Sequence, residues 1–213
     1  MDHYAILRNM YRKLSVVLFL FIFARTIQAG EVKALVGMNS SKYLFTAAAS
    51  SLNSQQKTGV RFGLGWAFNL VPKIKLELNA LYSQGGAKAS IAFAPNQSLS
   101  GFYRNTSLAL PIFLKYQFKT KATPYIALGP EFVFLLSHHF LLPDGENDYN
   151  LSDSTKKFIL AVTAMLGYEL PFGEWSLTVE IRYSRWLNNF LIDPETEARS
   201  ESFALLLGGA YHL

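Results

Sequence analysis

The chain has 213 residues, half of them hydrophobic, and a formal net charge of +5. This length suits one domain with or without a processed segment, and the lack of cysteine excludes disulfides, thiolate metal sites and cysteine nucleophiles. No stripe of basic residues interleaved with aromatic ones occurs, so we expect no nucleic-acid partner.

The first 29 residues have the features of a secretory signal peptide. Basic residues precede an apolar run at 14–23, and small Ala29 suits a cleavage site. The alternative is a retained membrane-crossing helix, but such a helix needs roughly 20 apolar residues and this run is far shorter. We expect a signal peptide over 1–29 and a single domain over 30–213. Its removal takes away four of the 20 basic and one of the 15 acidic residues, leaving a net charge of +2.

Eight segments of the remaining chain alternate apolar and polar residues with the period of two that is typical of β-strands. The alternation is clearest at 176–183, SLTVEIRY. No long segment with a helical period follows residue 30. The predicted strands are 32–39, 59–70, 73–84, 104–118, 123–136, 156–170, 173–186 and 202–213.

The connections between these strands alternate in length. Three tight turns are predicted at 69–73, 119–122 and 171–173. Four long, polar loops are predicted at 40–58, 85–103, 137–155 and 187–201. An outer-membrane barrel has this arrangement, because its turns face the periplasm, its loops face outward and an even strand count leaves both termini in the periplasm. We therefore expect an all-β fold, an eight-stranded antiparallel up-and-down transmembrane β-barrel in the outer membrane of a Gram-negative-type bacterium.

The apolar face of each strand is predicted to meet lipid. A closed barrel pairs all its backbone polar groups within the sheet, so its outer face does not need water. Aromatic residues on this face fall into two bands, as at membrane interfaces. The band at the turn ends comprises Phe68, Tyr116, Phe118, Tyr125, Tyr168, Trp175 and Tyr211, and the band at the loop ends comprises Tyr82, Phe134, Tyr183 and Phe203. Tyr125 is an exception, because its parity within the strand directs it inward.

The polar face is predicted to fill the lumen with charges of both signs. Eight strands enclose an interior that side chains just fill, so we expect a rigid salt-bridged plug and not an open pore. Acid–base catalysis by Glu77 and Glu180 is an alternative, but no sequence feature places a substrate beside them. The predicted lumen-facing structural charges are Arg61, Lys75, Glu77, Lys115, Glu131, Glu180 and Arg182, with Lys157 and Glu169 on the same face.

Two loop motifs suggest other chemistry. Ser137, His138 and His139 could belong to a Ser/His/acid hydrolase acting on outer-leaflet lipid, although adjacent histidines point to opposite sides of a strand. The acidic run at 144–148 suggests calcium, but Tyr149 and Thr155 occupy the positions where an EF-hand needs glycine and glutamate. We expect solvated residues at both motifs, and we predict no catalytic residue, cofactor or metal.

Four blocks of the sequence, at 81–88, 110–116, 124–130 and 180–184, resemble successive blocks of the PorT-like outer-membrane β-barrel domain family. The resemblance covers nearly all of the domain and implies an eight-stranded, porin-like barrel. It implies no activity, because most members of that family have no assigned biochemical role. Gly85 departs from the pattern, which often has lysine there.

The last six residues, 208–213, resemble the C-terminal signal that the outer-membrane assembly machinery reads, with Leu213 in place of the usual phenylalanine. The expected partners are therefore outer-membrane lipid, that machinery during biogenesis, and an unidentified surface ligand or protein at the long loops. Three functions stay open: a structural or loop-mediated binding protein of the cell envelope, an outer-leaflet lipid hydrolase, and a secreted soluble barrel that carries a ligand.

Overall fold

The computed structural model describes residues 30–46, 52–94, 97–118, 123–142, 148–192 and 197–213. The predicted signal peptide lies outside these residues. The strands are β1 (Gly30–Thr46), β2 (Leu52–Val71), β3 (Ile74–Ala94), β4 (Gln97–Gln117), β5 (Thr123–Leu141), β6 (Asp148–Asn150), β7 (Phe158–Phe172), β8 (Trp175–Trp186) and β9 (Glu197–His212), and a short 3-10 turn, η3, spans Ser152–Ser154.

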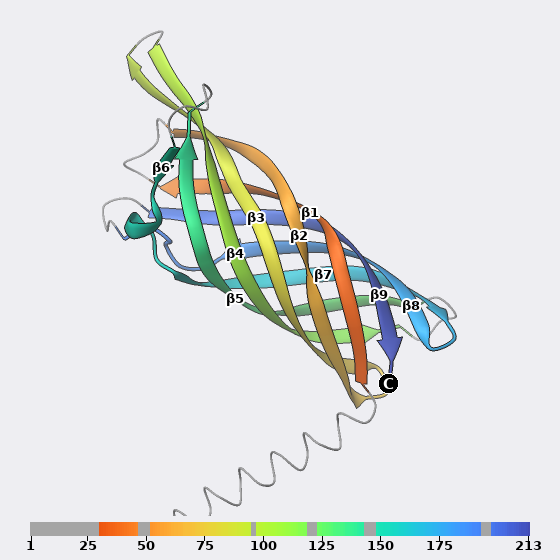
Figure 1. Ribbon diagram of the computed structural model, residues 1–213. Helices are drawn as coiled ribbons and strands as arrows, with labels where there is room; N and C mark the ends of the chain where they lie inside the picture. The colour runs from red at the N-terminus through yellow and green to blue at the C-terminus, as the bar shows by residue number, and fades with distance from the viewer. Residues whose placement is uncertain (1–29, 47–51, 95–96, 119–122, 143–147, 193–196) are drawn as a thin grey trace, which may run out of the picture.

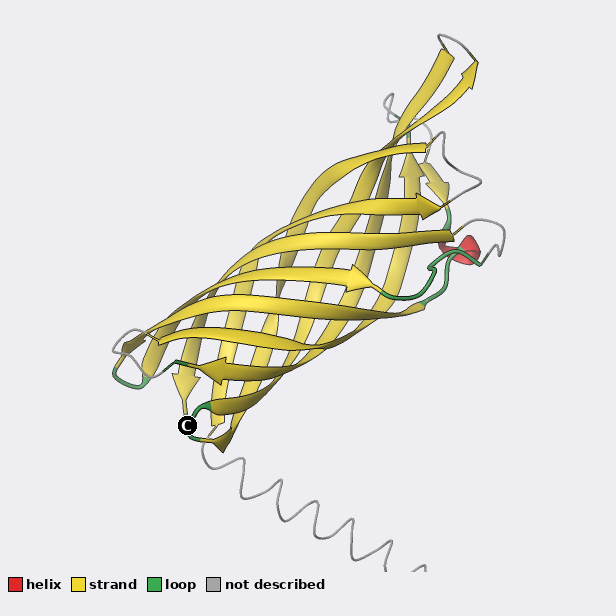
Figure 2. Ribbon diagram, turned by 180° about the vertical axis from the view of Figure 1, so that it is seen from behind, coloured by secondary structure: helices red, strands yellow, loops and turns green. Residues whose placement is uncertain are grey.

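The eight long strands form a closed antiparallel barrel in which each strand pairs with its neighbours in the chain (Figure 1). Pairing of β1 with β9 joins the first strand to the last, and pairing of β4 with β5 completes the ring. This architecture confirms the predicted fold. Short β6 pairs only with the end of β5, near η3 at the loop end of the barrel (Figure 2). No helix in the described residues is long and apolar enough to cross a bilayer.

Several strands continue beyond their predicted ends into segments expected to be loops. The largest difference is at 85–103, most of which forms the ends of β3 and β4, and this hairpin projects past the other strands (Figure 1). The polar sequence there lacks alternation because both faces of a strand outside the membrane can meet water, while the backbone hydrogen bonds of the ladder persist. Loss of the alternating pattern therefore marks the end of the apolar band and not the end of the strand.

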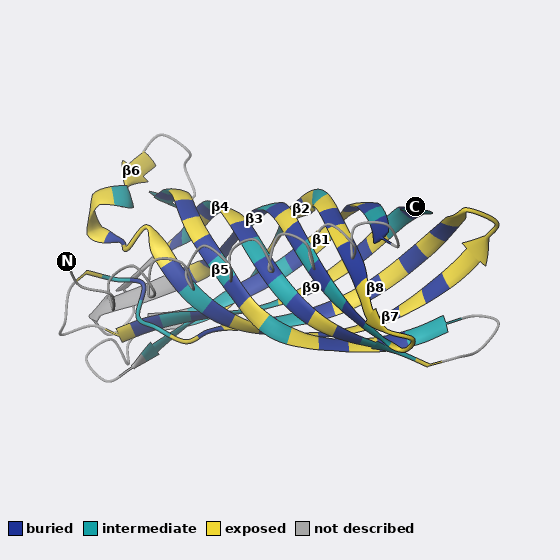
Figure 3. Cartoon of the chain, turned by 90° about the horizontal axis from the view of Figure 1, so that it is seen from below, coloured by how far each residue is buried: buried dark blue, intermediate teal, exposed yellow. Residues whose placement is uncertain are grey.

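Burial alternates along the strands as the sequence predicts (Figure 3). On β8 the outward-facing Ile181 is 52% exposed, whereas its neighbours Glu180 and Arg182 are fully buried in the lumen. The apolar side chains thus cover the outside of the barrel and the polar ones fill it. This arrangement is the reverse of a soluble ligand-carrying barrel, whose apolar face would line the cavity.

Aromatic side chains form two levels on the outer surface. On β8, Trp175 and Tyr183 stand eight residues apart. At about 3.3 Å per residue and a tilt of about 40°, this spacing corresponds to about 20 Å, close to the apolar band of about 25 Å in outer-membrane barrels. Tyr125 is fully buried in the lumen, as its parity indicates. Phe68, predicted to be lipid-facing, is only 5% exposed and stacks against the Trp66 ring.

The turn between β7 and β8 shows how the tight connections form. Gly173 has a φ of +68°, a backbone conformation that side chains with a Cβ rarely adopt. The chain reverses through Gly173 and Glu174 alone, whereas the turn was predicted at 171–173; Pro171 and Phe172 still belong to β7. The predicted turn at 119–122 lies outside the described residues.

Candidate functional site

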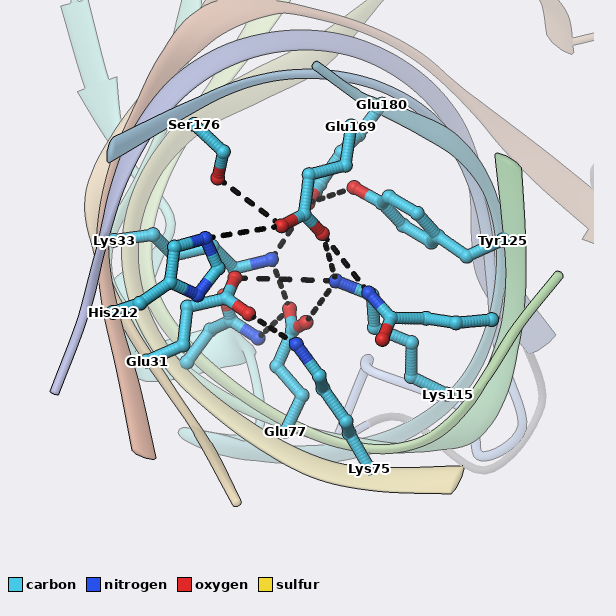
Figure 4. A network of polar contacts seen from close by, with 12 residues as sticks. Glu31, Lys33, Lys75, Glu77, Lys115, Tyr125, Glu169, Ser176, Glu180 and His212 are labelled. Atoms are coloured by element: carbon cyan, nitrogen blue, oxygen red, sulfur yellow. Dashed lines mark hydrogen bonds and ion pairs between the residues drawn. The ribbon is translucent and has the colours of Figure 1, made fainter. Parts of the chain in front are cut away.

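The lumen holds ten buried charged side chains among the described Lys, Arg and Glu residues, five acidic and five basic. Eight of them gather toward the turn end of the barrel, and we call this group the lumen plug (Figure 4). Because the numbers of the two signs are equal, each buried charge has a neutralising partner within the barrel. The lumen plug comprises Glu31, Lys33, Lys75, Glu77, Lys115, Glu169, Glu180 and Arg182.

The centre of the lumen plug joins strands that are far apart in the sequence. Lys33 on β1 places its Nζ 2.5 Å from Glu77 Oε1 on β3 and 2.7 Å from Glu180 Oε1 on β8. Arg182 donates from its Nε to Glu180 Oε2 at 2.9 Å, and Tyr125 donates its hydroxyl proton to Glu180 Oε1. These contacts hold opposite walls of the barrel together across the lumen.

Lys115 occupies the space between three carboxylates. Its Nζ lies 3.5 Å from Glu169, 3.6 Å from Glu77 and 4.0 Å from Glu31. The same ammonium group stands 3.8 Å from the centre of the Tyr125 ring, within the range of a cation–π contact. The ring in turn packs over Gly167, where a Cβ would overlap it. Lys115 therefore fills the lumen as well as balancing its charge.

A second ionic layer lies between the lumen plug and the loop end. Arg61 Nη2 donates to Glu131 Oε1 at 2.5 Å, and the hydroxyls of Thr163 and Ser184 donate to the other carboxylate oxygen. Next to this pair is a polar cavity of about 30 Å³, which has room for about two water molecules. It is too small for a ligand or a permeating solute. Its lining includes Asn39, Ser41, Ser83, Asn105, Ser107, Ser200 and Ser202.

Aromatic side chains pack together inside the loop end of the lumen. Tyr43 lies at their centre, with its ring 4.8 Å from the Phe190 ring and 5.5 Å from the Tyr103 ring. Its hydroxyl accepts a 2.7 Å hydrogen bond from Asn105 and stands 3.3 Å from His138 Nε2. We call Tyr43, Tyr103, His138, Trp186 and Phe190 the aromatic cap. Phe190 comes from a segment that was predicted as an outer loop and that folds back into the mouth.

The sequence prediction placed seven charges in the lumen, and all seven are buried there: Arg61, Lys75, Glu77, Lys115, Glu131, Glu180 and Arg182. Glu169 is buried with them. The prediction that Lys157 faces the lumen is wrong, because this residue precedes β7 at the loop end and is exposed. Glu31 and Lys33 were missed, although their alternation with Val32 and Ala34 is a signal that could have revealed them.

The proposed hydrolase residues have other partners. Ser137 Oγ lies 2.6 Å from Thr106 Oγ1, and His138 faces Tyr43 on the lumen side. On the outer side, His139 Nδ1 lies 2.7 Å from Asp148 Oδ1. Within the described part of the chain, these contacts do not join Ser137 to a histidine and an acid. Most of the acidic run at 144–148 lies outside the described residues.

A group with metal-ligating atoms lies at the turn end of the lumen plug. Ligand atoms of Glu31, Glu169 and His212 lie within 4.8 Å of one another. Lys75 Nζ is 2.7 Å from Glu31 and Lys115 Nζ is 3.5 Å from Glu169, so both carboxylates already have a cationic partner. A divalent ion would add charge to a neutral cluster, and this donor set therefore suits ion pairing better than metal binding.

The family model for the outer membrane protein beta-barrel domain matches residues 28–191. The chain belongs to this family of outer-membrane barrels. The match covers most of the sequence and agrees with the closed barrel and its apolar outer face. The outer membrane of a Gram-negative bacterium is therefore the location of the protein. No curated protein sequence matches the chain.

Solved structures with this fold include the outer membrane protein OprG of Pseudomonas aeruginosa, which is 11% identical with a TM-score of 0.52, over 87% of this chain and 97% of OprG. Neisserial surface protein A is 11% identical with a TM-score of 0.45, over 84% of this chain and 97% of its own. The attachment invasion locus protein Ail of Yersinia pestis is 14% identical with a TM-score of 0.45, over 85% of this chain and 99% of its own. At 11% identity the likeness to OprG shows the fold of our outer-membrane barrel and not its activity.

Proposed function

We propose that this protein is a closed, non-enzymatic outer-membrane barrel that supports the cell envelope or binds a surface ligand through its loop end. The observation that carries the proposal is the filled lumen, in which the lumen plug, the Arg61–Glu131 layer and the aromatic cap follow one another along the axis. Loops and strand ends that project from a rigid scaffold are common sites of recognition. The β3–β4 hairpin is the most prominent such element (Figure 1).

The proposed orientation puts the loop end outside the cell and both termini in the periplasm. It is supported by the turns between β2 and β3 and between β7 and β8, which are short, and by the projecting hairpin at the other end. We also assign the chain to the PorT-like branch of porin-like barrels on the four blocks at 81–88, 110–116, 124–130 and 180–184. The C-terminal residues 208–213 are proposed to engage the assembly machinery.

The proposed closure of the lumen predicts that the protein forms no stable channel. In planar lipid bilayers, the refolded wild type should show no sustained conductance above the background of the protein-free membrane. A porin with 16 strands, which leaves an aqueous channel, is the positive control. A heat-dependent mobility shift on gels checks that the protein added to the bilayer is folded. Reproducible single-channel steps from the folded wild type would refute the closed barrel.

The orientation can be tested by labelling, and the chain has no cysteine of its own to interfere. We expect Gln97→Cys, at the tip of the β3–β4 hairpin, to react in intact cells with a polyethylene-glycol maleimide too large to pass porins. Lys73→Cys, in the turn between β2 and β3, should react only after the outer membrane is permeabilised. The reverse pattern would show that the barrel is inverted.

A further inference from the structure

The outer surface of β1, β8 and β9 changes character in steps along the barrel axis. Around the middle of β8 and β9 it is apolar, with Ile181 and Leu205 each slightly more than half exposed. Next toward the loop end come Tyr183 and Phe203, whose ring centres are 4.8 Å apart. The next outward-facing residue on each strand is charged. In a bilayer this order corresponds to hydrocarbon, then the interface, then the headgroups.

The charged level consists of Lys42 on β1, Arg185 on β8 and Glu201 and Arg199 on β9, which we call the headgroup cluster. Glu201 lies between two cations, 3.8 Å from Lys42 Nζ and 3.6 Å from Arg185 Nη1. The Tyr183 hydroxyl lies beside both Glu201 and Arg185. The three cationic side chains are 39–50% exposed, whereas Glu201 is only 17% exposed. The carboxylate therefore holds Lys42 and Arg185 on its two sides, while these two cationic side chains stay far more exposed than the carboxylate itself.

The charges of this patch favour an anion. Lys42, Arg185 and Arg199 are opposed by Glu201 and by Glu197, which lies 3.6 Å from Arg199. Among the described residues of this patch one positive charge is left over, at the level where lipid headgroups stand. Guanidinium groups bind phosphate oxygens through paired N–H donors, and lysine adds a point charge.

We propose that the headgroup cluster binds the phosphate group of an anionic lipid in the outer leaflet. Arg185 and Lys42 hold the phosphate from two sides, and the Tyr183 and Phe203 rings pack beneath it against the first part of the acyl chains. The inference rests on the proposed orientation of the barrel, because only then does this level lie in the outer leaflet. Phosphate on a membrane-anchored molecule, and not free phosphate, is the proposed ligand.

The test measures lipid retained by the folded protein in native mass spectrometry, after release from nanodiscs of phosphatidylcholine mixed with lipid A. We expect the wild type to retain lipid A in preference to both phosphatidylcholine and dephosphorylated lipid A. The Lys42→Gln/Arg185→Gln variant should retain at least about fivefold less, since each cation near an anionic surface contributes about that factor. Arg104→Gln is the matched control, because Arg104 is as exposed as Arg185 and pairs with Asp148 on the other side of the barrel.

A second variant is expected to increase lipid A retention, so its result can be interpreted even if the double variant is unstable. Glu201→Gln removes the opposing carboxylate and should raise lipid A retention above the wild-type level. Equal retention by the wild type and the double variant, or an equal loss in Arg104→Gln, would overturn the proposal. Displacement of lipid A by millimolar inorganic phosphate would show an anion site without lipid specificity and would also overturn it. None of these outcomes changes the conductance or the labelling pattern, which test the closed barrel and its orientation separately.

Discussion

Replacing Glu77 with glutamine should lower the free energy of unfolding by about 3–5 kcal/mol, the usual cost of leaving a buried charge without its partner. Glu77 is fully buried, and its carboxylate lies 2.5 Å from Lys33, 3.6 Å from Lys115 and 3.9 Å from Arg182. The glutamine side chain keeps the shape of the residue but leaves one lumen cation in excess. Urea titration of the refolded protein in phospholipid vesicles measures the change.

Two controls separate charge balance from other effects. Glu197→Gln removes a carboxylate from an exposed pair with Arg199 and should cost less than about 1 kcal/mol. The Glu77→Gln/Lys115→Met variant restores equal numbers of acids and bases in the lumen and should recover a large part of the loss. If Glu77→Gln costs no more than Glu197→Gln, the lumen plug does not stabilise the barrel as we infer.

An arginine at the middle of the outer surface should also destabilise the protein strongly. Val179 lies on β8 midway between Trp175 and Tyr183 and is 41% exposed on the outside of the barrel. In a lipid bilayer, Val179→Arg should cost about 2–4 kcal/mol, the range for arginine at the midplane of an outer-membrane barrel. If this surface faced water, the same exposed substitution would stay within about 0.5 kcal/mol. Urea titration in vesicles distinguishes the two cases.

The matched control is Leu187, which follows β8 and lies beyond the level of the aromatic side chains. Leu187 is 48% exposed just past the end of β8, and Leu187→Arg should cost only about 0–1 kcal/mol, as near a membrane interface. A cost that falls with distance from the middle of β8 shows that lipid covers this surface. Equal costs at Val179 and Leu187 would contradict the lipid-facing assignment.

The sequence predicted most of the charges that face the lumen, but not which of them pair. Parity within a strand is local, so Glu77 and Arg182 could be placed inside the barrel from their immediate neighbours alone. The contact of Lys33 with both Glu77 and Glu180 depends on the register of β1, β3 and β8 around the closed ring. Register is set by the pairing of whole strands, which no short segment specifies.

The loop ends were the least predictable part for a related reason. Segments such as 85–103 have no apolar stripe, because strand residues beyond the membrane are not required to present one. Phe190 likewise gave no sign that it would close the lumen, since its partners Tyr43 and Trp186 come from different strands. The headgroup cluster was also invisible, because its members are brought together only by the adjacency of β1, β8 and β9.

The amino-acid sequence by itself determined that the protein is an eight-stranded barrel with an apolar outside and a charged inside. It could do so because the two-residue period of a strand assigns each side chain to a face, and lipid and lumen select opposite chemistry for the two faces. Only the tertiary structure decided how the ions in the lumen pair and which side chains fill its loop end. These properties depend on distances across the barrel, which closure and strand register set together.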